Sequence, residues 1–141
     1  MNRQEKYPET ATFHFYNANP RNRITGDCVF RAFTLGMNQD YRATVMEMAE
    51  LMCETGYALN DSKGEERYLA VKGWTKHKQP RKADNTKYTG KEFCKFLKRQ
   101  KNHSAIIAHI GGHHMVCIKD CKVWDIWDST DGCIGNYWTK D

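Results

Sequence analysis

The first half of the chain places apolar residues at helical spacing between polar breaks. An apolar run predicts a buried helix that begins at Cys28 and ends at Gly36. Asp40 is expected to cap a second helix that Gly56 ends, with a core-facing stripe formed by Tyr41, Val45, Met48 and Met52. Residues 65–71 predict a shorter helix.

The middle of the chain is basic and polar. Residues 73–87, broken by Pro80, are expected to form a surface loop. Thr89 is expected to begin another helix, which separates apolar from basic positions: Phe93, Phe96 and Leu97 against Lys91, Lys95, Lys98 and Arg99. The basic face of this helix is expected to be solvated.

The last third of the chain has the short apolar segments of strands. Residues 104–110 and 113–118 predict two strands joined by a Gly-Gly turn, and residues 123–127 and 134–138 predict two more. Helices followed by an antiparallel sheet indicate an α+β fold. Partial alternation over residues 11–16 suits a short strand or an extended arm.

Length and composition favour a single domain. The chain of 141 residues is 40% hydrophobic and 28% charged, as in ordinary globular proteins. We expect one domain over residues 1–141, in which residues 1–20 form an N-terminal arm. No apolar run approaches a membrane span, and the N-terminus lacks the apolar core of a secretion signal, so we expect a cytoplasmic protein without a membrane partner.

The six cysteines fit the same expectation. Without a secretion signal, reduced thiols are favoured over disulfides. No Cys-x-x-Cys pair occurs, so the spacing indicates neither a zinc ribbon nor a thioredoxin-type site. The cysteines are Cys28, Cys53, Cys94, Cys117, Cys121 and Cys133.

The positive charge is concentrated in one segment. The net charge is +5, but residues 61–101 hold 13 of the 22 Lys and Arg residues and only five acids. This segment therefore carries +8 and the rest of the chain −3. Such a surface can attract nucleic acid or an acidic protein, although a solvated face is the more common explanation.

The start of the Cys28 helix has the pattern of a presented nucleophile. Gly26 permits a turn, and Asp27 can accept the free amides of the first helical turn. Cys28 then occupies the helix N-terminus, where the dipole favours a thiolate. The alternative is a buried cysteine that acts only as a small hydrophobe.

The strand region supplies partners for this thiol. His113 and His114 follow the Gly-Gly turn, and Asp125 and Asp128 follow on the next strand. A histidine at the start of a strand can reach a thiol, and either carboxylate could orient the imidazole. The sequence thus offers a nucleophile, a base and an orienting acid in chain order.

With these motifs in place, the chain resembles the papain-like cysteine peptidases, particularly compact microbial members such as the bacteriocin-processing double-glycine peptidases. The matching segments are Gly26-Asp27-Cys28, Gly112-His113-His114-Met115-Val116 and Asp125-Ile126-Trp127-Asp128. The chain is also similar to small phage and bacterial proteins with a "Thr-Gly-Asp-Cys-x-x-Arg-Ala" helix start. The resemblance extends over residues 20–130.

The resemblance implies a papain-like fold and a Cys-His-Asp triad without a cofactor or metal. It makes Cys28 the nucleophile and His114 the general base, with Asp128 as the orienting acid and Asp125 as its rival. The glutamine that completes the family's oxyanion hole corresponds to Asn22. The implied activity is hydrolysis of a peptide or isopeptide bond in a protein or peptide substrate, through an acyl-enzyme.

Three alternatives remain. The same fold could serve as a non-catalytic binding module, such as a phage protein that sequesters a host factor. Residues 61–101 could bind nucleic acid. A zinc site formed by His113 or His114 with Cys117 and Cys121 fits by residue type, but strand alternation places His114 and Cys117 on opposite faces.

Overall fold

A computed structural model describes residues 1–140 of the chain as one α+β unit. The helices are α1 (Arg3–Lys6), α2 (Cys28–Met37), α3 (Tyr41–Thr55), α4 (Ser62–Val71) and α5 (Gly90–Arg99). The strands are β1 (Phe13–Phe15), β2 (Trp74–His77), β3 (Ile106–Ile110), β4 (His114–Lys119), β5 (Lys122–Asp125) and β6 (Ile134–Lys140).

The sheet is mixed rather than wholly antiparallel as expected. Its order is β1-β5-β4-β3-β6-β2, and β1 pairs in parallel with β5 while the other pairs are antiparallel. A long connection separates β1 from β5, so no tight turn forces these two strands to run in opposite directions.

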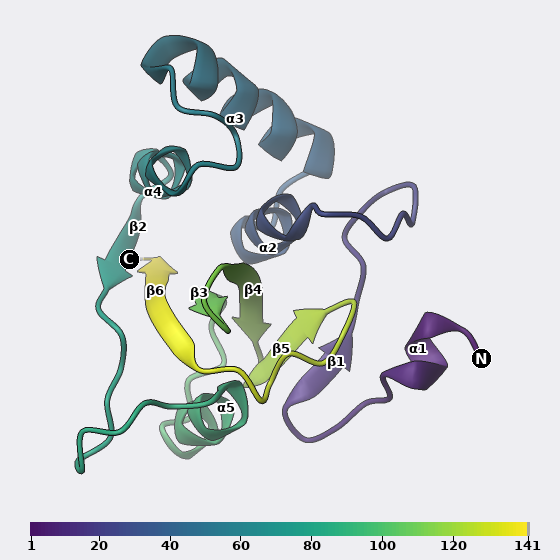
Figure 1. The fold of residues 1–141 in the computed structure, drawn as a ribbon, viewed down its shortest axis with the longest axis vertical. Coiled ribbons are helices and arrows are strands. Elements are labelled where there is room, and N and C mark those ends of the chain that lie inside the picture. The colour runs from purple at the N-terminus through teal and green to yellow at the C-terminus, as the bar shows by residue number, and fades with distance from the viewer. Residues whose placement is uncertain (141) are drawn as a thin grey trace.

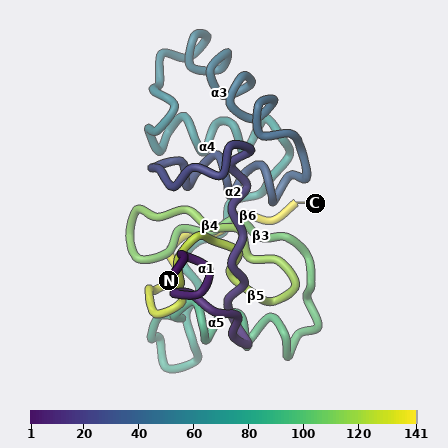
Figure 2. Tube along the Cα trace, turned by 90° about the vertical axis from the view of Figure 1, so that its right-hand side faces the viewer, coloured from purple at the N-terminus to yellow at the C-terminus, as the bar shows by residue number. Residues whose placement is uncertain are grey.

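The helices cover both faces of the sheet (Figures 1 and 2). On one face, α2, α3 and α4 pack over a core that includes Phe33, Leu69 and Trp138. On the other face, Phe93 and Leu97 of α5 cover a second core of strand residues. The alternation of β4 supplies both cores, because Val116 belongs to the second and its neighbours Met115 and Cys117 to the first.

Helix caps account for most of the helix boundaries. The Asp40 side chain accepts the Ala43 amide at the start of α3, and Gly56 ends that helix in a left-handed conformation, as expected. Thr89 caps α5 through a capping box with Glu92, which confirms the predicted start.

The core-facing stripe predicted for α3 is only partly correct. Met48 is buried, but Met52 is exposed, and the other fully buried residue of α3 is Thr44. The Thr44 hydroxyl accepts hydrogen bonds from Thr34 and Gln39, which satisfies this buried polar group. A polar residue thus occupies a core position that the spacing of hydrophobic residues does not reveal.

Two segments expected to be irregular belong to the sheet. Residues 73–87 include β2, whose buried Trp74 contributes to the first core. The expected N-terminal arm contains α1 and β1, and Phe13 of β1 has no exposed surface. Both strands lie at sheet edges and are only three or four residues long. Partial alternation over residues 11–16 indicated β1, whereas the four residues of β2 are too few for a detectable period.

No helix within residues 1–140 is long and apolar enough to cross a membrane.

Because Phe13 is fully buried, Phe13→Ala is expected to lower the free energy of unfolding by about 3–5 kcal/mol. The matched control is Met46→Ala, at a side chain that is 56% exposed, and we expect a change within about 0.5 kcal/mol. Urea unfolding measures both. Equal stabilities for the two variants would show that the N-terminal segment is not part of the core.

Candidate active site

Cys28 is the first residue of α2, where Asp27 occupies the N-cap position. Contrary to expectation, the Asp27 side chain makes no capping hydrogen bond. It accepts instead from Arg31 at 2.8 Å, from the Asn19 amide at 3.0 Å and from the Tyr41 hydroxyl at 2.8 Å. The amide of Cys28 therefore has no acceptor among the described residues and remains available beside the thiol.

His114 is placed by the turn before it and by the neighbouring strand. Gly111 and Gly112 have φ angles of 60° and 97°, a left-handed conformation that glycine adopts without strain. His114 then begins β4, and the antiparallel register of β4 and β5 brings the start of β4 next to the end of β5. Asp125 is the last residue of β5, and its Oδ2 lies 2.5 Å from His114 Nε2.

The structure corrects the choice of orienting acid from Asp128 to its rival Asp125. Asp128 lies beyond the end of β5 and holds a turn, where Oδ1 accepts the Thr130 amide at 3.0 Å and the Thr130 hydroxyl at 2.5 Å. The chain leaves the sheet after Asp125, so Asp128 does not remain in register with the start of β4.

Asn22 does not join the predicted site. It is exposed in a left-handed turn with φ of 54°, its Oδ1 accepts from Asn17 at 3.3 Å, and it does not line the hollow around Cys28. The backbone amide of Cys28 lies beside the thiol and can serve as an oxyanion donor.

Sequence reasoning missed Arg31, which connects the two acids of the site. Its side chain is 7% exposed, and it donates through Nε to Asp27 at 2.8 Å and through a terminal nitrogen to Asp125 Oδ1 at 2.6 Å. The available signal was an arginine within an otherwise apolar helix, because a buried guanidinium requires carboxylate partners.

Asp125 is consequently held from three sides. Oδ1 accepts from Arg31 and from the Ile126 amide at 2.7 Å, and Oδ2 faces His114. The carboxylate is 1% exposed, so these hydrogen bonds replace its hydration. Asp125 can therefore fix the orientation of the imidazole.

The thiol and the imidazole shift each other's pKa. Burial by itself would raise the pKa of Cys28, but a hydrogen bond with His114, the Met115 amide and the charges of His114 and Arg31 hold it below its ordinary value. Burial by itself would lower the pKa of His114, but its bonds to Asp125 and Cys28 raise the pKa to about 9. Both shifts favour the thiolate and the imidazolium over the neutral thiol and imidazole.

The two ring nitrogens of His114 face different partners. Nε2 is bonded to Asp125, which leaves Nδ1 as the nitrogen that can interact with Cys28. Trp127 lies against the imidazole, with ring centroids 5.0 Å apart. An indole in this position shields the His114–Asp125 bond from water, which strengthens it.

Cys28 differs from the buried cysteines of the chain. Burial raises the pKa of Cys94 and of Cys117 to about 12, and it also raises the pKa of Cys121. Buried thiols of this kind are unreactive. Cys28 lines an open hollow together with Thr25, Gly26 and Ile126.

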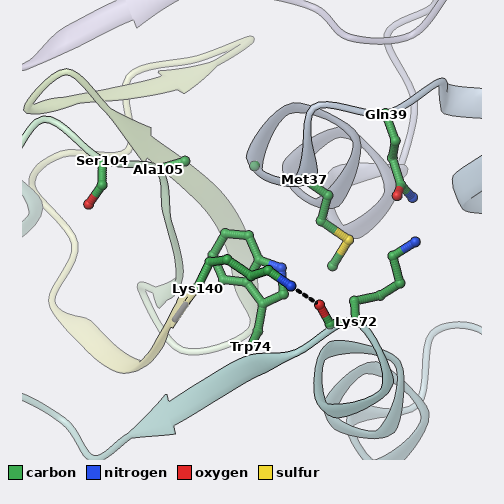
Figure 3. Close-up of a pocket in the computed structure, with 8 residues that line it drawn as sticks. Met37, Gln39, Lys72, Trp74, Ser104, Ala105 and Lys140 are labelled. Atoms are coloured by element: carbon green, nitrogen blue, oxygen red, sulfur yellow. Dashed lines mark hydrogen bonds between the residues drawn. The ribbon is translucent and has the colours of Figure 1, made fainter.

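A second hollow lies elsewhere on the α2 face of the sheet (Figure 3). Met37, Lys72, Trp74 and Lys140 line it, and Lys140 Nζ donates to the Lys72 carbonyl at 2.5 Å. None of its lining residues is a cysteine or a histidine, so it offers no thiol–imidazole pair.

The zinc site and the nucleic-acid surface considered from the sequence have less geometric support than the site around Cys28. Among residues 1–140, no three His, Cys, Asp or Glu side chains gather as metal ligands, and His113 is exposed while Cys117 is fully buried. Within the basic segment, four lysines form ion pairs with acids, which offsets part of the local charge: Lys72 with Glu47, Lys76 with Glu66, Lys82 with Glu92 and Lys91 with Asp131.

Comparison of the chain with protein-family models, curated proteins and solved structures finds no match.

The lowered pKa of Cys28 predicts fast alkylation by iodoacetamide below pH 8. Exposed Cys53 is the control, and Cys28 should be alkylated faster than Cys53 at such a pH. His114→Ala removes the interaction that lowers the pKa, so the rate at Cys28 should fall to that of Cys53 or lower. Mass spectrometry of each cysteine peptide measures the rates. Cys28 titrating near the ordinary thiol pKa of about 8.5 in the unaltered protein would contradict the ion pair.

The hydrogen bond from His114 to Asp125 is the largest of the interactions that raise the pKa of His114 to about 9. Asp125→Asn should therefore lower the pKa of His114 toward its ordinary value of about 6.5, while Asp128→Asn should leave it unchanged. Imidazole NMR shifts followed against pH measure this directly. A larger shift in the Asp128 variant would restore that residue as the orienting acid.

Proposed function

We propose that the chain is a papain-like cysteine hydrolase that cleaves a peptide or isopeptide bond. The observation that carries this proposal is the series formed by a thiol with a lowered pKa, His114 and the buried Asp125, with Nε2 and Oδ2 2.5 Å apart. This arrangement supplies a nucleophile, an acid–base group and its orienting partner.

In the first half-reaction, the Cys28 thiolate attacks the carbonyl carbon of the substrate and forms a carbon–sulfur bond. The amide of Cys28 donates to the developing oxyanion. His114 transfers its proton to the leaving nitrogen as the carbon–nitrogen bond breaks, which leaves a thioester on Cys28 and a neutral imidazole.

In the second half-reaction, His114 takes a proton from water, and the oxygen attacks the thioester carbon. The carbon–sulfur bond breaks, the carboxylic acid product leaves, and the thiolate–imidazolium pair is restored. Asp125 stabilises the imidazolium in both half-reactions, and the hydrogen bond from Arg31 holds Asp125 in its orientation.

A non-catalytic binding module with this fold is the second candidate. It is favoured by one observation, which is that Asn22 does not bring a side-chain amide to the hollow around Cys28. The oxyanion would then rely on backbone donors. This candidate predicts the fold and the hollow but no turnover.

Cys28→Ala is expected to abolish cleavage of a peptide library, because it removes the thiol whose pKa His114 lowers. Cys53→Ala is the matched control and should cleave like the unaltered protein. New peptide termini counted by mass spectrometry measure both. Equal cleavage by the two variants, or none by the unaltered protein, would refute the hydrolase proposal.

Hydrolysis is expected to fall as the pH rises through about 9, because His114 then loses the proton that the leaving nitrogen requires. It should fall again at low pH, as the Cys28 thiolate becomes protonated.

A further inference from the structure

The hollow around Cys28 contains a cation from the N-terminal segment. Arg3 lines this hollow with Cys28, His114 and Trp127, although it precedes the nucleophile by 25 positions. Its Nε donates to the carbonyl of Ile126 at 2.6 Å, and its guanidinium lies 5.5 Å from the centroid of the Tyr7 ring. Arg3 is therefore anchored beside the residue that follows Asp125.

The turn that presents Arg3 is itself fixed. Asn2 accepts the Glu5 amide at 2.8 Å, and Glu5 accepts the Asn2 amide at 3.3 Å, which closes a capping box around the first turn of α1. An anchored side chain on a capped turn loses less entropy when it binds a ligand than a free surface arginine does.

Arg3 also has unused hydrogen-bonding capacity. Within residues 1–140 it forms no ion pair, and its two terminal nitrogens have no acceptor. Arg31, the other arginine of the hollow, is already neutralised by Asp27 and Asp125. A free guanidinium fork matches the geometry of a carboxylate, which it can bind through two parallel hydrogen bonds.

The hollow beside Arg3 also has apolar surface that could contact the uncharged part of a peptide. Ile24 is 50% exposed and Trp127 is 37% exposed, and both line the same hollow. A Cβ built on Gly26 would meet no atom within 4 Å, so the chain is open next to Cys28. The hollow thus combines one unpaired cation with apolar surface and an open approach to the thiol.

We propose that Arg3 is a specificity-determining residue that binds a substrate carboxylate close to the bond that Cys28 attacks. The carboxylate is either an acidic side chain or a free C-terminus. As a statement about substrate, this inference rests on the proposed hydrolase function; as a statement about an anion site beside the thiol, it can be tested without turnover.

Two alkylating reagents separate charge from thiol reactivity. Iodoacetate and iodoacetamide both lose iodide to the same thiolate, but only iodoacetate carries a carboxylate. The ratio of their rates at Cys28 therefore cancels the thiolate fraction and reports the local charge. Arg3→Gln should lower this ratio about fivefold, the effect of one unit charge about 4 Å away in water.

Two further variants make the result specific. Lys6→Gln removes a positive charge from the same helix, at a residue that also contacts Tyr7 but does not line the hollow, so the ratio should stay unchanged. Arg3→Lys keeps the charge, so its ratio of iodoacetate to iodoacetamide rates should stay close to that of the unaltered protein. Equal losses in Arg3→Lys and Arg3→Gln would mean that α1 had moved, and an unchanged ratio in Arg3→Gln would mean that no anion site exists. Either result overturns the proposal.

Peptide substrates then identify the source of the carboxylate. Pairs that differ as Glu against Gln test the side chain, and pairs with a free or an amidated C-terminus test the terminal carboxylate. We expect kcat/KM to favour the charged member of one pair in the unaltered protein and to lose this preference in Arg3→Gln. Cleavage without either preference would overturn the substrate role of Arg3. A ratio that depends on Arg3 without any cleavage would instead refute the hydrolase and leave the anion site standing.

Discussion

The buried ion network around Arg31 is the constraint on which the site depends. One guanidinium, on the second turn of α2, binds the acid that precedes the nucleophile and the acid that ends β5. Removing one partner from such a network leaves a buried charge uncompensated and costs about 3–5 kcal/mol. Arg31 therefore couples the start of α2 to the end of β5.

This network also explains why Asp27 does not cap α2. Its two oxygens are occupied by Arg31, Asn19 and Tyr41, and a capping bond would compete with these interactions. The uncapped amides then remain beside Cys28, where they can stabilise negative charge on the sulfur or on an oxyanion. The missing cap costs the helix some local stability, and the free amides that it leaves make the surroundings of Cys28 polar.

The N-terminal segment contributes to the hollow around Cys28. Arg3 of α1 lines the hollow around the thiol, and β1 pairs with β5, whose last residue is Asp125. Phe13 of β1 is buried in the core, and Arg3 bonds the Ile126 carbonyl. The first fifteen residues of the chain therefore contribute both to the core and to the hollow.

The sequence by itself determined the elements with strong local signals and indicated two of the residues that line the hollow, Cys28 and His114. The caps at Asp40 and Thr89, the apolar helix after Cys28 and the β-branched segments after residue 104 depend on neighbours in the chain, and all were predictable. Cys28 was singled out by its position at the start of a helix, and His114 was chosen over His113 on the resemblance to papain-like peptidases. Only the tertiary structure decided that Asp125 rather than Asp128 faces His114, that Arg31 holds it, that Asn22 lies away from the hollow, and that β1 runs parallel to β5. Each of these depends on strand register or on contacts between distant segments, and local periodicity carries no information about either.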